Sequence, residues 1–232
     1  MVSIEHGQWQ SSSWSRSLKK VLIIFVKVGL SLGIIAWLEK RRMAGHYAAD
    51  ADQARQKVLE LIPAGSTVFR CGSSSVAELG LWKQIEALDG VNLINPYQPG
   101  LTPEEGLARR RQGLTADVMV ASSNAITLDG RLVNLDGMGN RVAAMTFGPA
   151  KVVLLVGMNK VVKDLECAVE RVKHYSAPVN AMRLNLDTPC NQNGLCADCR
   201  APKRICNFWS VIEGSMIPNR IHVVLVGAKL GY

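Results

Sequence analysis

The stretch DVMVASSNAITLDGRLVNLDGMGNRVAAMTFGPAKVVLLVG, residues 117–157, decides the fold. It contains an expected strand at 117–126, a Leu-Asp-Gly turn at 128–130 and a short expected strand at 131–134 that pairs back as a hairpin. A helical stretch from Asn140 and the apolar run KVVLLVG at 151–157 follow. Short β-rich runs that alternate with helical stretches are typical of a sheet covered by helices. This segment therefore predicts an α/β core.

The same alternation continues on both sides of that stretch. We expect helices over 51–61, 76–88, 103–112 and 161–174, and strands over 66–70, 91–95, 209–212 and 220–226. A chain of 232 residues with 48% hydrophobic and 20% charged residues has the size and composition of one globular domain. The sequence therefore predicts an α/β fold with a single mixed or mostly parallel sheet flanked by helices.

An apolar run, VLIIFVKVGLSLGIIAWL, occupies residues 21–38 near the N-terminus. A helix that is apolar on all sides is buried either in protein or in lipid. Since a spanning helix needs about 20 residues, a membrane helix and a buried core helix both remain open. The basic residues Lys40, Arg41 and Arg42 follow the run, which favours a cytoplasmic position for the rest of the chain. We therefore divide the chain into an N-terminal helix with basic flanks, 1–43, and an α/β domain, 44–232, with membrane association through 21–38 as one possibility.

The net charge of +8 at pH 7 raises the question of an anionic partner. Half of this excess lies in the first fifty residues, where it flanks the apolar run. We find neither zinc-finger spacing nor interleaved basic and aromatic residues elsewhere, so no nucleic-acid partner is expected. The other basic run, Arg109–Arg111, is expected on a solvated helix face.

A glycine–serine turn, Gly72 to Ser75, connects an expected strand to an expected helix. Backbone N–H groups at such a turn point outward and can hold a carboxylate or a phosphate. The alternative is structural, because Ser74 or Ser75 can simply cap the helix that follows.

The segment SSNAITLDGRLVNLDGMGNRVAA, residues 122–144, is rich in Asn, Asp and Gly. Such residues form turns readily and also present donors and acceptors at strand ends. Arg141 is suited to bind a carboxylate or phosphate through two parallel hydrogen bonds. The alternative is a network of structural turns in which Arg141 pairs with Asp136.

Four of the six cysteines, Cys190, Cys196, Cys199 and Cys206, lie within the polar segment 188–207. Four thiolates in one loop can bind one metal centre, and the C-x-x-C pair is common in such sites. Zinc and an iron–sulfur cluster both accept four cysteines, so the ligand count leaves the metal undecided. Two disulfides, or a redox dithiol at Cys196 and Cys199, are the alternatives.

Several segments together resemble the LUD-domain family of lactate-utilisation proteins: GSSSVAELGLW at 72–82, the long segment at 122–172, APVNAMRLNLDTPCNQNGLCADCRAPKRICN at 177–207, and the ending RIHVVLVGAKLG. The resemblance covers roughly residues 38–232. It implies a fold related to the ribose-phosphate isomerase and CoA-transferase group, in which turns at strand ends line a ligand cleft. It gives no catalytic residue. The pocket residues it implies are Gly72, Ser73, Ser74, Ser75, Asn124, Asp136, Gly137, Asn140, Arg141, Asn159 and Lys160.

The resemblance also implies a role in the oxidation of lactate to pyruvate, beside iron–sulfur partner subunits. We therefore expect an organic-acid oxidation or electron-transfer subunit that binds a small carboxylate or a phosphorylated ligand and carries an iron–sulfur cluster or zinc at its four cysteines. Two alternatives remain: a non-redox enzyme of the isomerase or CoA-transferase kind, and a scaffold or binding subunit with structural zinc. The histidine spacings and the lack of a G-x-S-x-G segment give no support to a conventional hydrolase.

Overall fold

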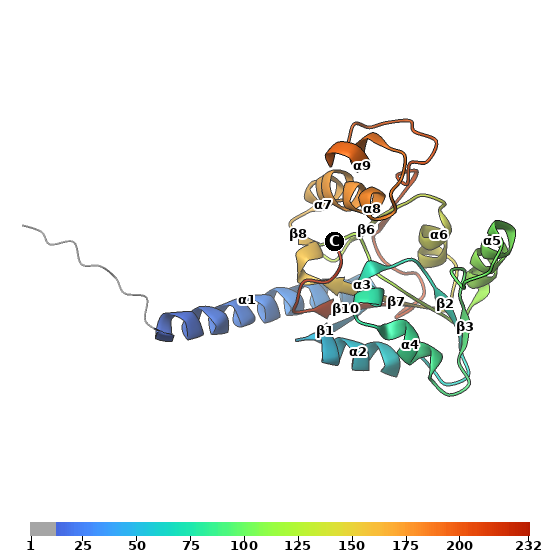
Figure 1. Ribbon diagram of the computed structural model, residues 1–232. Coiled ribbons are helices and arrows are strands. Elements are labelled where there is room, and N and C mark those ends of the chain that lie inside the picture. The colour runs from blue at the N-terminus through green and yellow to red at the C-terminus, as the bar shows by residue number, and fades with distance from the viewer. Residues whose placement is uncertain (1–12) are drawn as a thin grey trace, which may run out of the picture.

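The computed structural model describes residues 13–232, and its centre is a six-stranded sheet in which every neighbouring pair of strands is parallel (Figure 1). The strand order is β1-β10-β7-β4-β2-β3. The bounds are Ala44–Ala48 for β1, Thr67–Arg70 for β2, Asn92–Ile94 for β3, Val118–Ala121 for β4, Lys151–Gly157 for β7 and Ile221–Val226 for β10. The expected α/β class with a mainly parallel sheet is confirmed.

Helices α2 (Ala51–Glu60), α3 (Ser74–Glu78) and α4 (Leu81–Glu86) cover one face of this sheet. Side chains alternate between the two faces along a strand, and β7 displays this directly. Val153 and Leu155 pack toward these helices, while Val152, Leu154 and Val156 pack on the opposite side. All five are fully buried, and each such side chain stabilises the fold by roughly 1.5–3 kcal/mol. Because β7 is buried on both faces, its sequence is a continuous apolar run.

A second sheet lies on the opposite side of the main sheet, with strand order β8-β5-β6-β9. Its strands are β5 (Ala125–Thr127), β6 (Leu132–Asp136), β8 (Val161–Val162) and β9 (Phe208–Ile212). It packs on its outer side against α7 (Leu165–Arg171) and a π-helical turn (Val172–Ser176), which continues into α8 (Ala177–Arg183). The remaining helices are α5 (Pro103–Gln112), α6 (Asn140–Thr146) and α9 (Pro189–Asn193), with two short 3₁₀ turns at Gly113–Thr115 and Met158–Lys160.

The sequence predicts one strand over 117–126 and does not predict a second sheet. In the structure this segment forms β4 in the main sheet and most of β5 in the second sheet. The chain turns between them where Ser123 Oγ donates to the carbonyl oxygens of Ala125 and Val133. The helix expected at 76–88 is likewise divided into α3 and α4, since Gly80 adopts a left-handed conformation with φ of 63°.

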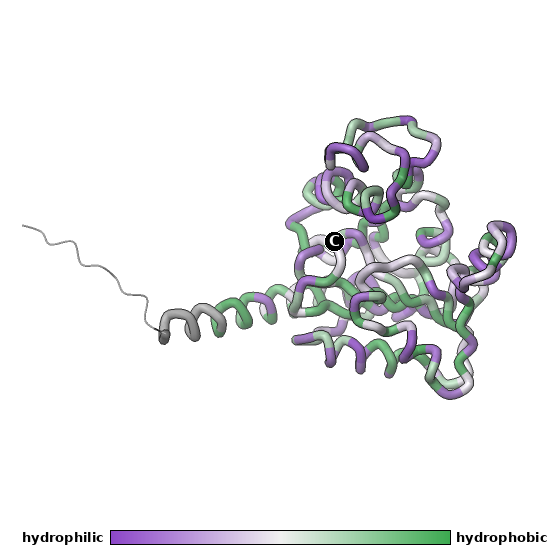
Figure 2. Tube along the Cα trace, in the orientation of Figure 1, coloured by the Kyte–Doolittle hydropathy of each residue, from purple (hydrophilic) through white to green (hydrophobic). Residues whose placement is uncertain are grey.

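Helix α1 (Ser13–Lys40) contains the apolar run of residues 21–38, and the two halves of that run differ in burial. Ser31, Ile34 and Leu38 are fully buried against the domain, and Lys27 Nζ donates a hydrogen bond of 2.8 Å to the Gly227 carbonyl. Residues 21–26 are instead exposed, with relative exposures of 46–71%. They belong to the part of α1 that projects from the domain, where the chain is strongly hydrophobic (Figures 1 and 2).

The segment Val21–Lys40 is long and apolar enough to cross a membrane by length and composition alone. A core helix of a soluble protein and a signal sequence pass the same test. The expected domain boundary at residue 43 falls between α1 and β1, yet the C-terminal half of α1 packs on β1: a Cβ added at Gly45 would lie 2.8 Å from Ile35 Cγ1. This half of α1 is therefore part of the α/β core.

Candidate functional site

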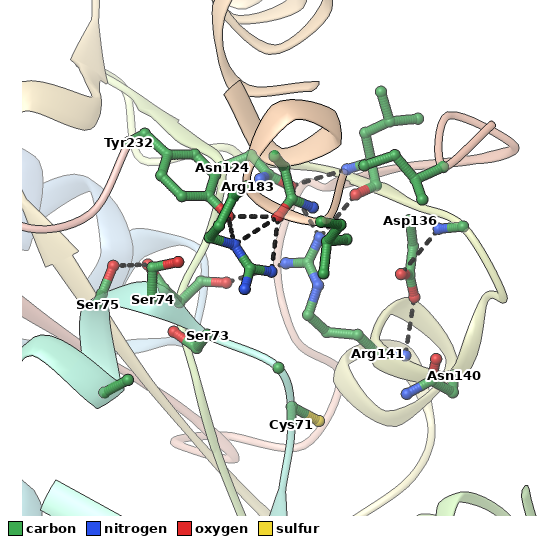
Figure 3. Close-up of a pocket in the computed structure, with 18 of the residues that line it drawn as sticks. Cys71, Ser73, Ser74, Ser75, Asn124, Asp136, Asn140, Arg141, Arg183 and Tyr232 are labelled. Atoms are coloured by element: carbon green, nitrogen blue, oxygen red, sulfur yellow. Dashed lines mark hydrogen bonds between the residues drawn. The ribbon is translucent and has the colours of Figure 1, made fainter. Parts of the chain in front are cut away.

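A cleft of about 760 Å³ lies at the carboxyl edge of the main sheet (Figure 3). The segments that follow four strands contribute to it: Gly72 follows β2, Ser122 follows β4, Lys160 follows β7 and Tyr232 follows β10. Carboxyl ends of parallel strands meet at one edge, which is where open α/β sheets bind their ligands. The opposite wall comes from the β6–α6 connection and from α8.

Lys160 is the most unusual ionisable group in the cleft. Its side chain is almost completely buried, and Nζ donates to Ser75 Oγ at 2.8 Å and to Ser122 Oγ at 2.9 Å. Burial lowers the pKa of Lys160 to about 7, and the positive charges of Arg171 and Arg141 add to the shift. Near neutral pH a large fraction of this amine is uncharged and can accept a proton.

Arg141 lines the cleft as expected, but its guanidinium donates hydrogen bonds to other residues of the chain. Nη1 donates to the Ser122 carbonyl at 3.0 Å and to Asn134 Oδ1 at 3.1 Å, while Nη2 donates to Asn124 Oδ1 and the Leu135 carbonyl, both at 2.8 Å. These acceptors belong to the β4–β5 connection and to β6. Arg141 therefore joins two walls of the cleft.

The carboxylate of Asp136 is also used internally. It accepts hydrogen bonds from the backbone N–H groups of Gly137 and Arg141 at 2.9 Å, and from that of Val142 at 3.4 Å. A carboxylate in this position satisfies N–H groups in the first turn of a helix, here α6. The expected pairing of Asp136 with Arg141 thus occurs through the Arg141 backbone.

The structure brings ten of the eleven expected ligand-binding residues together along this cleft. They are Gly72, Ser73, Ser74, Ser75, Asn124, Asp136, Gly137, Asn140, Arg141 and Lys160. Asn159 is not among the residues lining it. Asn159 Oδ1 accepts from the Leu230 N–H and Nδ2 donates to the Gly231 carbonyl, both at 3.0 Å, so this side chain fixes the segment after β10. The Ser73 hydroxyl caps α3, whereas the structural alternative assigned this cap to Ser74 or Ser75, which lie inside the helix.

Sequence analysis missed three arginines of the cleft, Arg70, Arg110 and Arg183. Arg110 belongs to the run that was assigned to solvent. Its guanidinium lies 5.1 Å from the ring centroid of Tyr97, and that of Arg70 lies 5.2 Å from the ring of Trp82. Stacking on an aromatic ring leaves the N–H edge of a guanidinium available to an anion.

Arg183, on α8, is oriented by its neighbours. Its Nε donates to Asn180 Oδ1 and to Tyr232 Oη, both at 3.1 Å (Figure 3). Four arginines and one lysine line the cleft, against Glu78 and Asp136. The resulting positive potential favours a carboxylate or a phosphate as ligand.

A comparison with protein families matches the LUD domain over residues 33–226. The chain belongs to the LUD domain family. The resemblance found in its motifs is thereby confirmed, and the chain is a protein of the lactate-utilisation type. No curated protein matches this LUD chain significantly.

Three solved structures resemble the LUD chain in fold. A DUF162 family protein from Deinococcus radiodurans is 14% identical, with a TM-score of 0.48; the match covers 86% of this chain and 97% of that one. Ribose 5-phosphate isomerase from Plasmodium falciparum is 16% identical over 49% and 52% of the two chains, with a TM-score of 0.32. The eIF2B delta subunit from Chaetomium thermophilum is 17% identical over 53% and 54%, with a TM-score of 0.35. These similarities concern the fold alone.

The four clustered cysteines of the LUD chain line a second, smaller cavity of about 190 Å³. All four are free thiols, so the disulfide alternative is not what the structure contains. Burial raises the pKa of the Cys206 thiol; Arg204 opposes this shift, and the nearby Cys196 and Cys199 add to it. Within residues 13–232, no group of three or more His, Cys, Asp or Glu side chains is arranged so that it could hold a metal ion. Cys71, by contrast, is a buried core residue whose pKa is raised by burial.

Proposed function

We propose that this LUD protein binds a small carboxylate or phosphorylated anion in its arginine-lined cleft and acts as a subunit in the oxidation of an organic acid, lactate to pyruvate. The observation that carries this proposal is Lys160, held between the hydroxyls of Ser75 and Ser122 at a cleft rich in positive charge. A metal centre at the four cysteines and iron–sulfur partner subunits belong to the same proposal.

Oxidation of a 2-hydroxy acid uses a group that binds the carboxylate and a base that accepts the hydroxyl proton, and the cleft contains side chains suited to both. Arg110 and Arg183 are positioned to bind the carboxylate, because both line the cavity and present guanidinium N–H groups to it. Lys160 can accept the proton of the 2-hydroxyl group, since its pKa of about 7 keeps much of the amine neutral. Conversion of lactate to pyruvate also releases the C2 hydrogen and two electrons, and iron–sulfur partner subunits would supply the acceptor for these electrons.

Titration calorimetry with lactate, pyruvate and inorganic phosphate tests the proposal. Arg110→Met should weaken binding of the preferred anion roughly 10-fold or more, as expected for a hydrogen bond to a charged group. Arg111→Met is the matched control, because it removes the same charge from the same helix but does not line the cleft. Absence of binding by all three anions, or equal losses in both variants, would argue against an anion site here.

A non-redox isomerase-like activity is the second candidate, and the same side chains favour it. The Lys160 amine beside two hydroxyls can move a proton between adjacent carbon atoms without any electron acceptor. Incubation with pyruvate in D₂O, followed by proton NMR, separates the two functions. Exchange of the C3 protons by isolated wild-type protein but not by Lys160→Met supports the second candidate.

A further inference from the structure

Lys160 is a buried amine without an acidic partner. The residue is only 4% exposed, and no carboxylate among residues 13–232 forms an ion pair with it. In this part of the chain, Nζ makes its hydrogen bonds to the neutral hydroxyls of Ser75 and Ser122. Burial of an ammonium ion without a counter-ion is strongly unfavourable, whereas an uncharged amine is buried at much lower cost. The surroundings of Lys160 therefore favour the uncharged form, which is a nucleophile.

The charged groups around Lys160 act in the same direction. Arg141 of α6 and Arg171 of α7 disfavour another positive charge, whereas the weaker influence of Glu78 of α3 opposes them. Together with burial, these charges lower the pKa of Lys160 to about 7. A lysine is activated for attack on a carbonyl group when desolvation or a neighbouring cation lowers its pKa in this way.

The hydrogen bonds around Nζ leave its lone pair free. Ser75 Oγ donates to the Leu230 carbonyl and to Ser122 Oγ, both at 3.3 Å, and Ser122 Oγ donates to the Ser123 carbonyl at 3.2 Å. Each hydroxyl has a single proton, so both serine oxygens are left to accept from Lys160. An uncharged amine has two N–H groups, which these oxygens take up, and one lone pair. That lone pair has no partner among the described residues and can attack an electrophile.

The segment after β10 keeps one side of the amine clear of side-chain atoms. Gly231 has a left-handed conformation with φ of 61°. A Cβ added there would lie 3.2 Å from Lys160 Nζ and 2.6 Å from Ser75 Oγ. Lys160 and both serines line the cleft of about 760 Å³, which has ample room for a three-carbon acid. A small ligand bound in this cleft can therefore approach the amine.

The positive charge of the cleft and the proposed oxidation together indicate the electrophile. Arg110 and Arg183 line the same cleft and favour a carboxylate. A base that accepts the hydroxyl proton of lactate lies within hydrogen-bond distance of that oxygen. The same oxygen becomes the carbonyl oxygen of pyruvate, so the carbonyl carbon of the product lies one bond farther from Nζ. A 2-oxo acid in this position presents its most electrophilic carbon to the amine.

We propose that Lys160 forms a reversible imine with a 2-oxo acid such as pyruvate, an inference that rests on the anion cleft of the proposed function. The lone pair of Nζ forms a bond to C2 while the carbonyl electrons move to oxygen, which takes up a proton from the amine. The C2–O bond then breaks, the oxygen leaves as water with the second amine proton, and a C=N bond forms. Ser75 and Ser122 lie beside Nζ and can relay these protons. The step consumes no oxidant or reductant.

Reductive trapping on full-length protein tests the inference. Pyruvate and sodium cyanoborohydride, which converts an imine to a stable secondary amine, are added at pH 7, and intact mass spectrometry measures the product. We expect one 1-carboxyethyl group per chain, located at Lys160 by peptide mapping of the wild type. Selectivity follows from protonation, because an ordinary exposed lysine is uncharged in roughly one molecule in a thousand at this pH. Lactate has no carbonyl group and should give no adduct.

Lys160→Met should reduce the adduct to background. Lys163→Met is the matched control and should keep it, because Lys163 follows on the same segment but has a side chain that is 81% exposed and does not line the cleft. Far-UV circular dichroism verifies that both variants fold. Peptide mapping of the wild type locates the adduct without any substitution.

Three outcomes overturn the inference, and calorimetry with pyruvate on the same preparation separates them. Binding of pyruvate without an adduct contradicts the imine but leaves the anion site of the proposed function in place. An adduct that is spread over exposed lysines, or that persists in Lys160→Met, contradicts the assignment to Lys160. Neither binding nor an adduct contradicts both the imine and the anion site.

Discussion

The anion cleft and the cysteine cavity share a wall, yet they are held in shape by different means. In the cleft, Arg141 alone donates four hydrogen bonds that join the β4–β5 connection to β6, and Lys160 bridges two serines on separate segments. Around the cysteines, residues 195–207 contain neither helix nor strand, and the Arg204 Nε lacks a partner among the described residues.

This difference indicates that the two sites depend on a bound ligand for their shape to different degrees. The cleft is organised by the protein before any ligand arrives, which lowers the entropy lost on binding. The cysteine segment lacks regular secondary structure over 195–207, so a bound metal centre would add to its order. Four experiments test or sharpen this contrast.

The largest effect is expected at Lys160. Below about pH 7 its amine carries a proton and cannot accept another, whereas above that pH it is neutral. Turnover that uses it as a base should therefore rise as the pH increases through about 7. Lys160→Met should reduce turnover by 10²–10⁴-fold, the usual contribution of a general base, while calorimetry still detects anion binding. A variant with wild-type turnover and pH profile would exclude Lys160 as the base.

Arg141→Met should cause the next largest change, in stability. The substitution removes four hydrogen bonds in the cleft wall, although Asn124 Oδ1 and Asn134 Oδ1 each keep a backbone donor. We expect the free energy of unfolding to fall by about 2–4 kcal/mol. Urea denaturation measures this value. Arg110→Met removes an equal charge from the same cleft and should change stability by less than about 1 kcal/mol. Similar losses in both variants would mean that the cleft is not held by its internal hydrogen bonds.

Removal of the metal centre should have a smaller and local effect. Hydrogen exchange of the chelated protein should speed up within 188–207, and the amides of β7 should stay protected. Mass spectrometry of peptides from the two segments provides the comparison. Exchange in 188–207 that is unaffected by chelation would indicate that this segment, like the cleft, is ordered by the protein alone.

The smallest effect on stability is expected in the exposed half of α1, which contributes to neither cavity. Phe25→Gln should change the free energy of unfolding by no more than about 0.5 kcal/mol. If this half binds a membrane, the same variant should sediment less with vesicles of anionic lipid. Ile217→Gln is the control, since Ile217 is also exposed but lies far along the chain, before β10. Equal sedimentation of both variants and the wild type would exclude a contribution of Phe25 to membrane binding.

The sequence predicted those helices and strands whose formation depends on residues close together in the chain. Strand β7 was predicted because burial on both faces requires a continuous apolar run. Helix α5 begins at Pro103 with a capping box formed by Thr102 and Glu105, and the expected range 103–112 is confirmed. The loops that line the cleft were predicted because Gly, Ser and Asn at strand ends are suited both to turns and to ligands.

Other features depend on distant parts of the chain and left no local signal. The segment 117–126 does not indicate that β4 and β5 belong to different sheets, since both strands are buried. Strand β1 is short and contains His46, whose stacking on His222 of β10 appears only in the folded chain. Arg183 and Tyr232 are far apart in sequence and meet at the cleft because the segment after β10 reaches α8.

Two short connections beside the cleft join the two sheets, from β4 to β5 through residues 122–124 and from β7 to β8 through residues 158–160. The longer β6–β7 connection, 137–150, also lines the cleft. A rotation of one sheet against the other would have its axis close to these short connections. Ser122 and Lys160 lie on them, and both touch Ser75. Such a rotation would therefore change the backbone that carries Ser122 and Lys160 and, with it, the hydrogen bonds of both side chains to Ser75.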